Sequence, residues 1–62
     1  MQPLLILSSD VPGALYLNGR YAGELAAEAE AALPVAPRGP MVIEHRPLVA
    51  GYLPMARRLT LS

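Results

Sequence analysis

The feature that most constrains this chain is the dipeptide Asn18-Gly19, which stands between two short runs of strand-forming residues. Both residues tolerate a positive φ, and the preferred two-residue turns between antiparallel strands need a positive φ at both central positions. The dipeptide therefore predicts a β-hairpin in which residues 14–17 pair with residues 20–23. The register that such a loop fixes is, outward from the turn, Leu17 with Arg20, Tyr16 with Tyr21, Leu15 with Ala22, and Ala14 with Gly23.

The two faces of this predicted hairpin differ in chemistry. Side chains alternate between the faces of a strand, so Leu15, Leu17 and Ala22 share one face and the two tyrosines share the other. We interpret the leucine face as core. Tyr16 and Tyr21 are then expected to pair with each other on the outer face.

Other short apolar runs, separated by Pro and Gly, predict further strands at residues 4–7, 41–45 and 55–61. In Val11-Pro12-Gly13, Pro and Gly fit the two central positions of a type II turn. Residues 33–40 contain three prolines and predict a loop with a turn at Arg38-Gly39, because proline lacks the N–H that strand pairing needs. Residues 48–51 are expected to connect the last two strands.

Residues 24–33 are ambiguous. Their composition of Ala, Glu and Leu favours a helix. The strict alternation over residues 27–31 favours a half-buried strand instead. Context places the strand slightly ahead, and the helix stays open as the alternative.

The predicted elements add up to an all-β fold, a small antiparallel sandwich of five to seven short strands in a single domain over residues 1–62. The chain has 62 residues, no cysteine and zero net charge, and 53% of its residues are apolar. These values argue against a disulfide scaffold, a thiolate zinc site, a nucleic-acid surface and disorder. A domain of this size buries only about 60% of its unfolded surface, so we expect it to be a module of a longer protein or to bury more surface against a partner.

The apolar run at residues 4–7 is too short for a signal peptide or a membrane span, so no membrane insertion is expected. It is apolar on both faces, which leaves Leu4 and Ile6 as candidates for an interface between two copies of the chain. A symmetric homodimer is the commonest outcome of such self-association.

No arrangement of titratable residues predicts catalysis, a metal site or a cofactor. Ser8, Ser9, Asp10 and His45 contain the atoms of a nucleophilic triad, but no nucleophile elbow surrounds the serines, and they read more simply as turn residues. His45 is the single histidine and is expected on a sheet face or edge. Residues predicted to lie on a solvated surface or a sheet edge are Glu24, Glu28, Glu30, Arg57 and Arg58.

The tyrosines are the main binding candidates. Exposed aromatic rings with a polar tip suit protein interfaces and sugar stacking, which makes Tyr16 and Tyr21 a candidate ligand face. The alternative is that they pack under the proline-rich loop as a second minor core. Tyr52, after Gly51, is expected to anchor the last turn into the core.

Two blocks of the sequence resemble the PEGA domain family. The block Val11-Pro12-Gly13-Ala14 through Gly23-Glu24, with its Asn-Gly hairpin, is similar to the family's opening, and the block from Gly51-Tyr52 to Leu61 is similar to its closing strand. Leu25-Ala26 depart from the Thr-Pro that usually follows Gly-Glu in the family. The resemblance covers about residues 3–62. It implies a sandwich akin to transthyretin-like and carboxypeptidase-regulatory-like modules, an extracytoplasmic or cell-envelope location in bacteria, and no catalytic residues.

The sequence therefore predicts a non-enzymatic module that mediates protein or cell-envelope contacts, without a cofactor. Two alternatives remain open: a carbohydrate-binding accessory module that uses Tyr16 and Tyr21, and a structural homo-oligomerisation domain.

Overall fold

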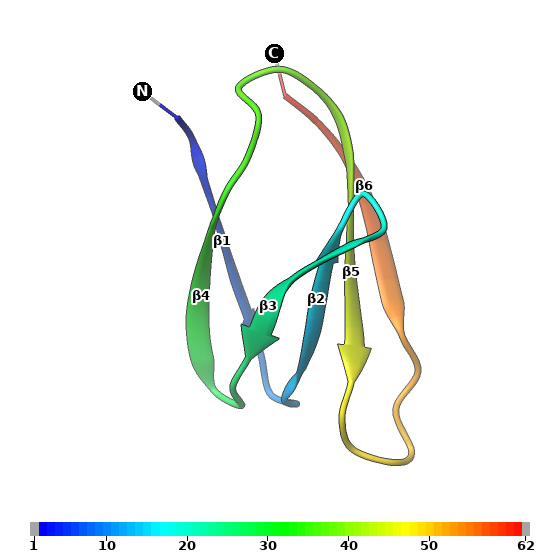
Figure 1. Ribbon diagram of the computed structural model, residues 1–62. Helices are drawn as coiled ribbons and strands as arrows, with labels where there is room; N and C mark the ends of the chain where they lie inside the picture. Colours follow the sequence, from blue (N-terminus) through cyan, green and yellow to red (C-terminus); the bar gives the residue numbers. More distant parts are fainter. Residues whose placement is uncertain (1, 62) are drawn as a thin grey trace.

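The computed structural model describes residues 2–61, and all the regular structure in this range is β-strand. Figure 1 shows the strands as two layers, with the start of β1 and the end of β6 at the same end of the molecule. The six strands are β1 (Leu4–Ser9), β2 (Gly13–Leu17), β3 (Arg20–Leu25), β4 (Ala29–Pro34), β5 (Gly39–Pro47) and β6 (Met55–Leu61). The predicted all-β fold is confirmed, and none of the described segments is a helix that could cross a membrane.

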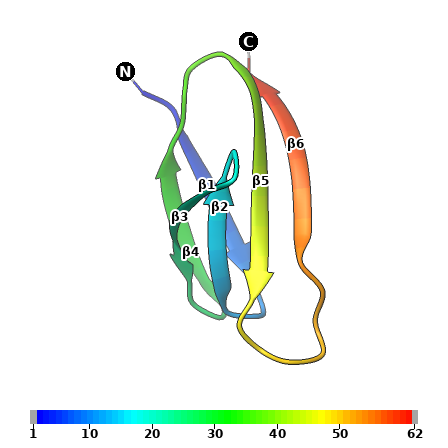
Figure 2. The ribbon, with the colours of Figure 1, turned by 45° about the vertical axis from the view of Figure 1, so that its right-hand side comes forward.

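The strands form two antiparallel sheets. One contains β1 and β4, and the other has the strand order β3-β2-β5-β6. In Figures 1 and 2, β6 lies on the side of the molecule away from β1 and β4. The arrangement is a small sandwich whose two-stranded sheet is narrower than the four-stranded one.

The Asn-Gly hairpin is confirmed. Asn18 and Gly19 have φ values of 52° and 84°, as the predicted turn requires. The side-chain Oδ1 of Asn18 also accepts a hydrogen bond of 2.9 Å from the Val42 N–H, while the Asn18 N–H donates to the Val42 carbonyl at 2.8 Å. The turn is therefore fastened to the neighbouring strand β5 as well as closing the hairpin.

The predicted hairpin register is correct at the two pairs nearest the turn and wrong beyond them. A β-bulge at Ala22 makes Leu15 pair with Gly23, and it makes Ala14 pair with Glu24. Gly23 has a backbone φ of 143°, which residues with a side chain rarely adopt. The extra residue shifts the alternation of β3, so that Ala22 packs against the core and the buried Leu25 also points inward.

The turn before the hairpin also differs from the prediction. Gly13 is the first residue of β2, and it does not take the positive φ of a type II turn. The bend lies at Asp10 and Val11, where the Ser9 hydroxyl accepts a hydrogen bond of 3.1 Å from the Val11 N–H. Pro12 directly precedes β2, and its carbonyl accepts a hydrogen bond of 3.0 Å from the Leu48 N–H.

Residues 24–33 form neither a single strand nor a helix. β3 ends at Leu25, residues 26–28 turn, and β4 begins at Ala29. Glu28 takes a positive φ of 58°, and its N–H donates to the Ser9 carbonyl at 2.8 Å. The alternation over residues 27–31 indicated a strand correctly only from Ala29 onward, because pairing with β1 starts there.

The proline-rich loop is shorter than predicted. Pro34 ends β4, and Pro40 is the second residue of β5, where it pairs with Thr60 of β6. Pro40 is tolerated because its backbone nitrogen faces the side of β5 on which β2 would pair. β2 pairs with β5 only from Ile43 onward, so no N–H is needed at Pro40. The turn at Arg38-Gly39 is present, and Gly39 has a φ of 102°.

The core lies between the two sheets in two adjoining clusters. One is built on Leu15, Leu25 and Leu33, and the other on Val35, Met41 and Ile43. Leu15 is only 2% exposed, and burial of a leucine of this kind stabilises the fold by about 1.5–3 kcal/mol. Leu7 of β1 contacts both clusters. As predicted, Leu15, Leu17 and Ala22 face this core.

Candidate interaction surface

An apolar tip projects from the end of the sandwich at the connection between β5 and β6. Figures 1 and 2 show this connection extending past the ends of the other strands. Leu53 is 83% exposed, and the other exposed apolar side chains of this segment are Leu48, Val49, Tyr52 and Met55. We call these five residues the apolar tip. Its base is held by a hydrogen bond of 3.0 Å from the Leu48 N–H to the Pro12 carbonyl.

The predicted core anchor at Tyr52 is wrong. Tyr52 is 57% exposed and belongs to the apolar tip. The turn at Ala50-Gly51, with a φ of 94° at Gly51, lies beyond the ends of both sheets, so no core surface is available beneath the ring.

Strand β6 is an edge strand with one row of unused backbone groups. The Val42 N–H donates to Asn18 Oδ1, and the Val42 carbonyl accepts from the Asn18 N–H, so both backbone groups of Val42 point away from β6. Successive residues of a strand point these groups to opposite sides, so Met41 and Ile43 point their N–H and C=O toward β6. These two residues pair with Leu59 and Arg57. The backbone groups of Ala56, Arg58 and Thr60 therefore point outward, away from β5.

Two arginines stand in the middle of this edge. Arg57 lies opposite Ile43 on the inner side of the sheet, and Arg58 lies opposite Val42 on the outer side. Both are exposed. Within residues 2–61 the single ion pair joins Arg46 and Glu44, so neither arginine of β6 is neutralised by a neighbour.

The outer face of the two-stranded sheet is a second apolar surface. Leu4 is 60% exposed and Ile6 is 54% exposed, whereas Leu5 and Leu7 pack against the core. Across the sheet, Ile6 pairs with Ala32 and Leu4 with Pro34. The expectation that residues 4–7 have apolar side chains on both faces is confirmed.

The two hairpin tyrosines are placed as predicted on the outer face, and their rings meet edge to face. The ring centroids of Tyr16 and Tyr21 are 5.8 Å apart, with an angle of 77° between the planes. The Arg46 guanidinium lies over the Tyr16 ring, 3.9 Å from its centroid. One face of Tyr16 is thus covered and the two rings are not coplanar, so the pair does not form the flat platform on which a sugar would stack.

Arg46 is held in this position by Glu44. Its Nε and Nη2 atoms donate to the two carboxylate oxygens at 2.8 Å and 3.2 Å. The hydrogen bond lowers the pKa of Glu44 below its ordinary value and raises the pKa of Arg46. The guanidinium therefore contacts both the Glu44 carboxylate and the Tyr16 ring, and these contacts link the outer faces of β2 and β5.

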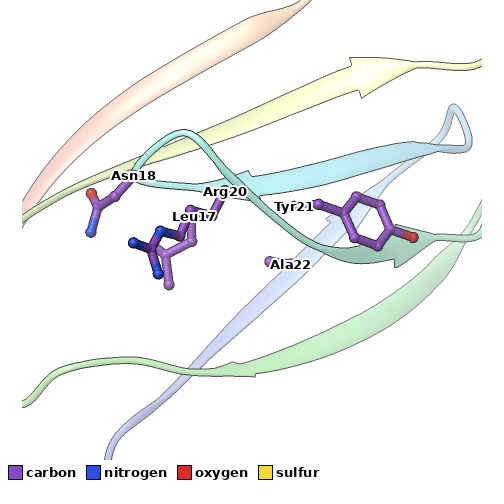
Figure 3. Close-up of a pocket in the computed structure, with 5 residues that line it drawn as sticks. All are labelled: Leu17, Asn18, Arg20, Tyr21 and Ala22. Carbon is purple, nitrogen blue, oxygen red and sulfur yellow. The ribbon is translucent and has the colours of Figure 1, made fainter.

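A hollow beside the hairpin turn is lined by five residues, shown in Figure 3. Leu17 and Arg20 lie next to each other there, and Tyr21 points away from them along β3. The side-chain polar groups of the lining residues are the Asn18 amide, already bonded to Val42, the Arg20 guanidinium and the Tyr21 hydroxyl, which points away from the other two. This set offers neither a nucleophile nor an acid–base pair.

His45 is more deeply placed than the sequence indicated. It lies on the inner side of β5, its Nε2 is buried without a hydrogen-bond partner, and its ring rests against Gly13. Ser8 and Ser9 line the same cavity of about 140 Å³, which is otherwise mostly apolar. No hydrogen bond joins a serine to the imidazole, and the Ser9 hydroxyl is used by Val11, so a nucleophile–base pair is not assembled.

The acidic residues are spread over turns and strand ends. Glu24 is exposed on β3, Glu28 is in the turn before β4, and Glu30 is on β4. Asp10, Glu28 and Glu30 line a depression near the end of β1. Among residues 2–61, no group of acidic or histidine side chains is arranged to hold a metal ion.

In comparisons with known proteins, no family model, curated protein or solved structure matches this chain. A proposal for its function therefore depends on its own surface and on the sequence resemblance.

Proposed function

We propose that the chain is a non-enzymatic interaction module, a PEGA-like sandwich that binds a partner protein in the bacterial cell envelope. The observation that carries the proposal is the distribution of apolar side chains. Among residues 2–61, six hydrophobic residues are buried in the core, while eight large hydrophobic residues are exposed, five of them in the apolar tip. Several exposed apolar side chains within one short connection are typical of protein-binding sites.

The apolar tip has the composition of a binding surface. It combines Tyr52 and Met55, two residue types enriched at interfaces, with three aliphatic side chains. Burial of one exposed leucine against a partner contributes about 1.5–3 kcal/mol. Burial of Leu48 and Leu53 would therefore favour binding, and the translational and rotational freedom lost on association offsets part of this gain.

Site-specific photocrosslinking tests this proposal. A benzophenone amino acid replaces Leu53 in one variant and the exposed Arg38, at the opposite end of the sandwich, in the control. Both are expressed within the natural protein in its own cells. We expect a discrete crosslinked protein from position 53 and none from position 38. Equal crosslinking at both positions, or none at position 53, would contradict a binding role for the tip.

Self-association is the second candidate function, and the exposed Leu4 and Ile6 on the outer face of the two-stranded sheet favour it. A dimer formed there would cover both side chains. Sedimentation velocity between about 10 μM and 1 mM, a range that spans weak association, compares the chain with Ile6→Lys. A concentration-dependent dimer abolished by the substitution supports this function, and a monomer throughout contradicts it.

A further inference from the structure

We propose that the open edge of β6 binds an extended acidic segment of the partner protein, which adds to the four-stranded sheet as a fifth strand. This inference rests on the proposed protein-binding role and names the surface and the chemistry of the partner. Strand addition to an exposed edge takes its affinity from main-chain hydrogen bonds and its specificity from alternate side chains.

The backbone of β6 offers a complete row for such a strand. Ala56, Arg58 and Thr60 point three N–H and three C=O groups away from β5. The strand has seven residues and none is proline. The other edge of the same sheet is less suitable, because the bulge at Ala22 and Gly23 interrupts β3.

The charge of the edge selects the partner. Adjacent residues of a strand point to opposite faces, so Arg57 presents its charge on the inner side and Arg58 on the outer side. Neither has an acidic partner among residues 2–61. An incoming strand with two adjacent acidic residues would place one carboxylate beside each guanidinium.

A second copy of the chain fits this edge poorly in full overlap. A fully overlapped antiparallel pairing of two Met55–Leu61 strands sets Arg58 opposite the Arg58 of the other copy. Like charges directly opposite each other destabilise strand pairs. The arginines therefore disfavour fully overlapped self-pairing and favour an acidic strand.

The apolar tip continues this surface. Met55 is both the first residue of β6 and a member of the tip, and its side chain is exposed on the inner side of the strand. Leu53 lies two residues before it. A strand paired along β6 would thus reach the tip, and an apolar residue flanking its acidic pair would contact Leu53 and Met55.

A charge-swap experiment tests the proposal. The probes are the capped peptide Thr-Val-Thr-Glu-Glu-Val-Thr-Val and its matched control with Lys-Lys at the centre. Each is titrated into the ¹⁵N-labelled chain, and binding is followed by amide shifts. We expect the acidic peptide to shift and protect the amides of Ala56, Arg58 and Thr60. The lysine peptide should bind roughly tenfold more weakly or worse, as expected for two exposed charge pairs.

Two variants separate charge from backbone pairing. The double variant Arg57→Glu/Arg58→Glu should reverse the preference, so that the lysine peptide binds better than the acidic one. Ala56→Pro removes one outward N–H and leaves both arginines, so it should weaken both peptides without changing their order. Spectra of the unbound variants verify that each is folded. An unreversed preference in the charge variant, or unchanged binding in the proline variant, would overturn the proposal.

Two further outcomes are decisive. Response of the β6 amides to phosphatidylserine vesicles, with no response to either peptide, would make the edge a lipid-binding surface and overturn the proposal. If the acidic peptide fails to bind while position 53 still crosslinks to a protein, the strand-addition model falls and the protein-binding role stands. If both fail, the protein-binding role falls as well.

Discussion

Gly13→Ala is expected to destabilise the fold through a collision with His45. A Cβ atom at Gly13 would lie 2.7 Å from the Arg46 carbonyl oxygen and 2.8 Å from His45 Cε1, and it would overlap His45 Nε2. These separations are below those that carbon atoms tolerate, so the imidazole or the backbone of β5 must move. Overpacking of this kind costs about 1–3 kcal/mol.

The cost is large relative to the stability of a domain this small. At about 0.05–0.15 kcal/mol per residue, 62 residues give roughly 3–9 kcal/mol in total. A loss of about 2 kcal/mol corresponds to a fall of about 8–16 °C in the midpoint of thermal unfolding. Circular dichroism at the β-sheet minimum, followed on heating and in urea, measures the change.

A second background tests the mechanism. In His45→Ala the imidazole is absent, so the Gly13→Ala substitution should cost less there than in the natural chain. Some cost should remain, because the Arg46 carbonyl is still close. An unchanged melting midpoint for Gly13→Ala, or an equal loss in both backgrounds, would refute the placement of His45 over Gly13.

Three other substitutions test separate parts of the fold. Asn18→Gly keeps a positive φ accessible but removes the acceptor for the Val42 N–H, so we expect a loss of about 0.5–1.5 kcal/mol in urea unfolding, and an unchanged midpoint would contradict that bond. Gly23→Ala forces a side chain into the φ of 143° at the bulge and should cost about 1–3 kcal/mol, with wild-type stability as the contrary result. Glu44→Gln should lower the melting midpoint more at pH 7 than at pH 3. Because the folded-state pKa of Glu44 is depressed, its contribution is complete above its ordinary value of 4.5 and is lost as the pH falls through the folded value. An identical difference at both pH values would argue against the Glu44–Arg46 pair.

Local turn chemistry and strand alternation were enough to predict the hairpin and the all-β class. Asn18-Gly19 has few other conformations available, and it fixed the neighbouring pairs Leu17 with Arg20 and Tyr16 with Tyr21. The bulge after those pairs was not predictable from alternation, because it arises from the need to bury both Ala22 and Leu25 against the second sheet. That need depends on strands that are distant in sequence.

The candidate site was only partly predictable for the same reason. The exposure of Leu4 and Ile6 followed from an apolar run that is longer than one face of a strand requires. Tyr52 was misplaced, because the sequence does not show that its turn lies beyond both sheets. Arg57 and Arg58 were correctly expected at an edge, but their importance depends on the strand order β3-β2-β5-β6, which leaves β6 outermost.

Amide hydrogen exchange along β6 tests the central claim most directly, because the account requires an edge strand with an unused row of backbone groups. At about 50 μM, well below the millimolar range of weak self-association, the amides of Arg57 and Leu59 should be protected by their bonds to β5. Those of Ala56, Arg58 and Thr60 should exchange nearly as fast as in an unfolded chain. Protection of all five amides would show that the edge is already covered, and protection of none would show that β6 does not belong to the sheet; either result would contradict the account.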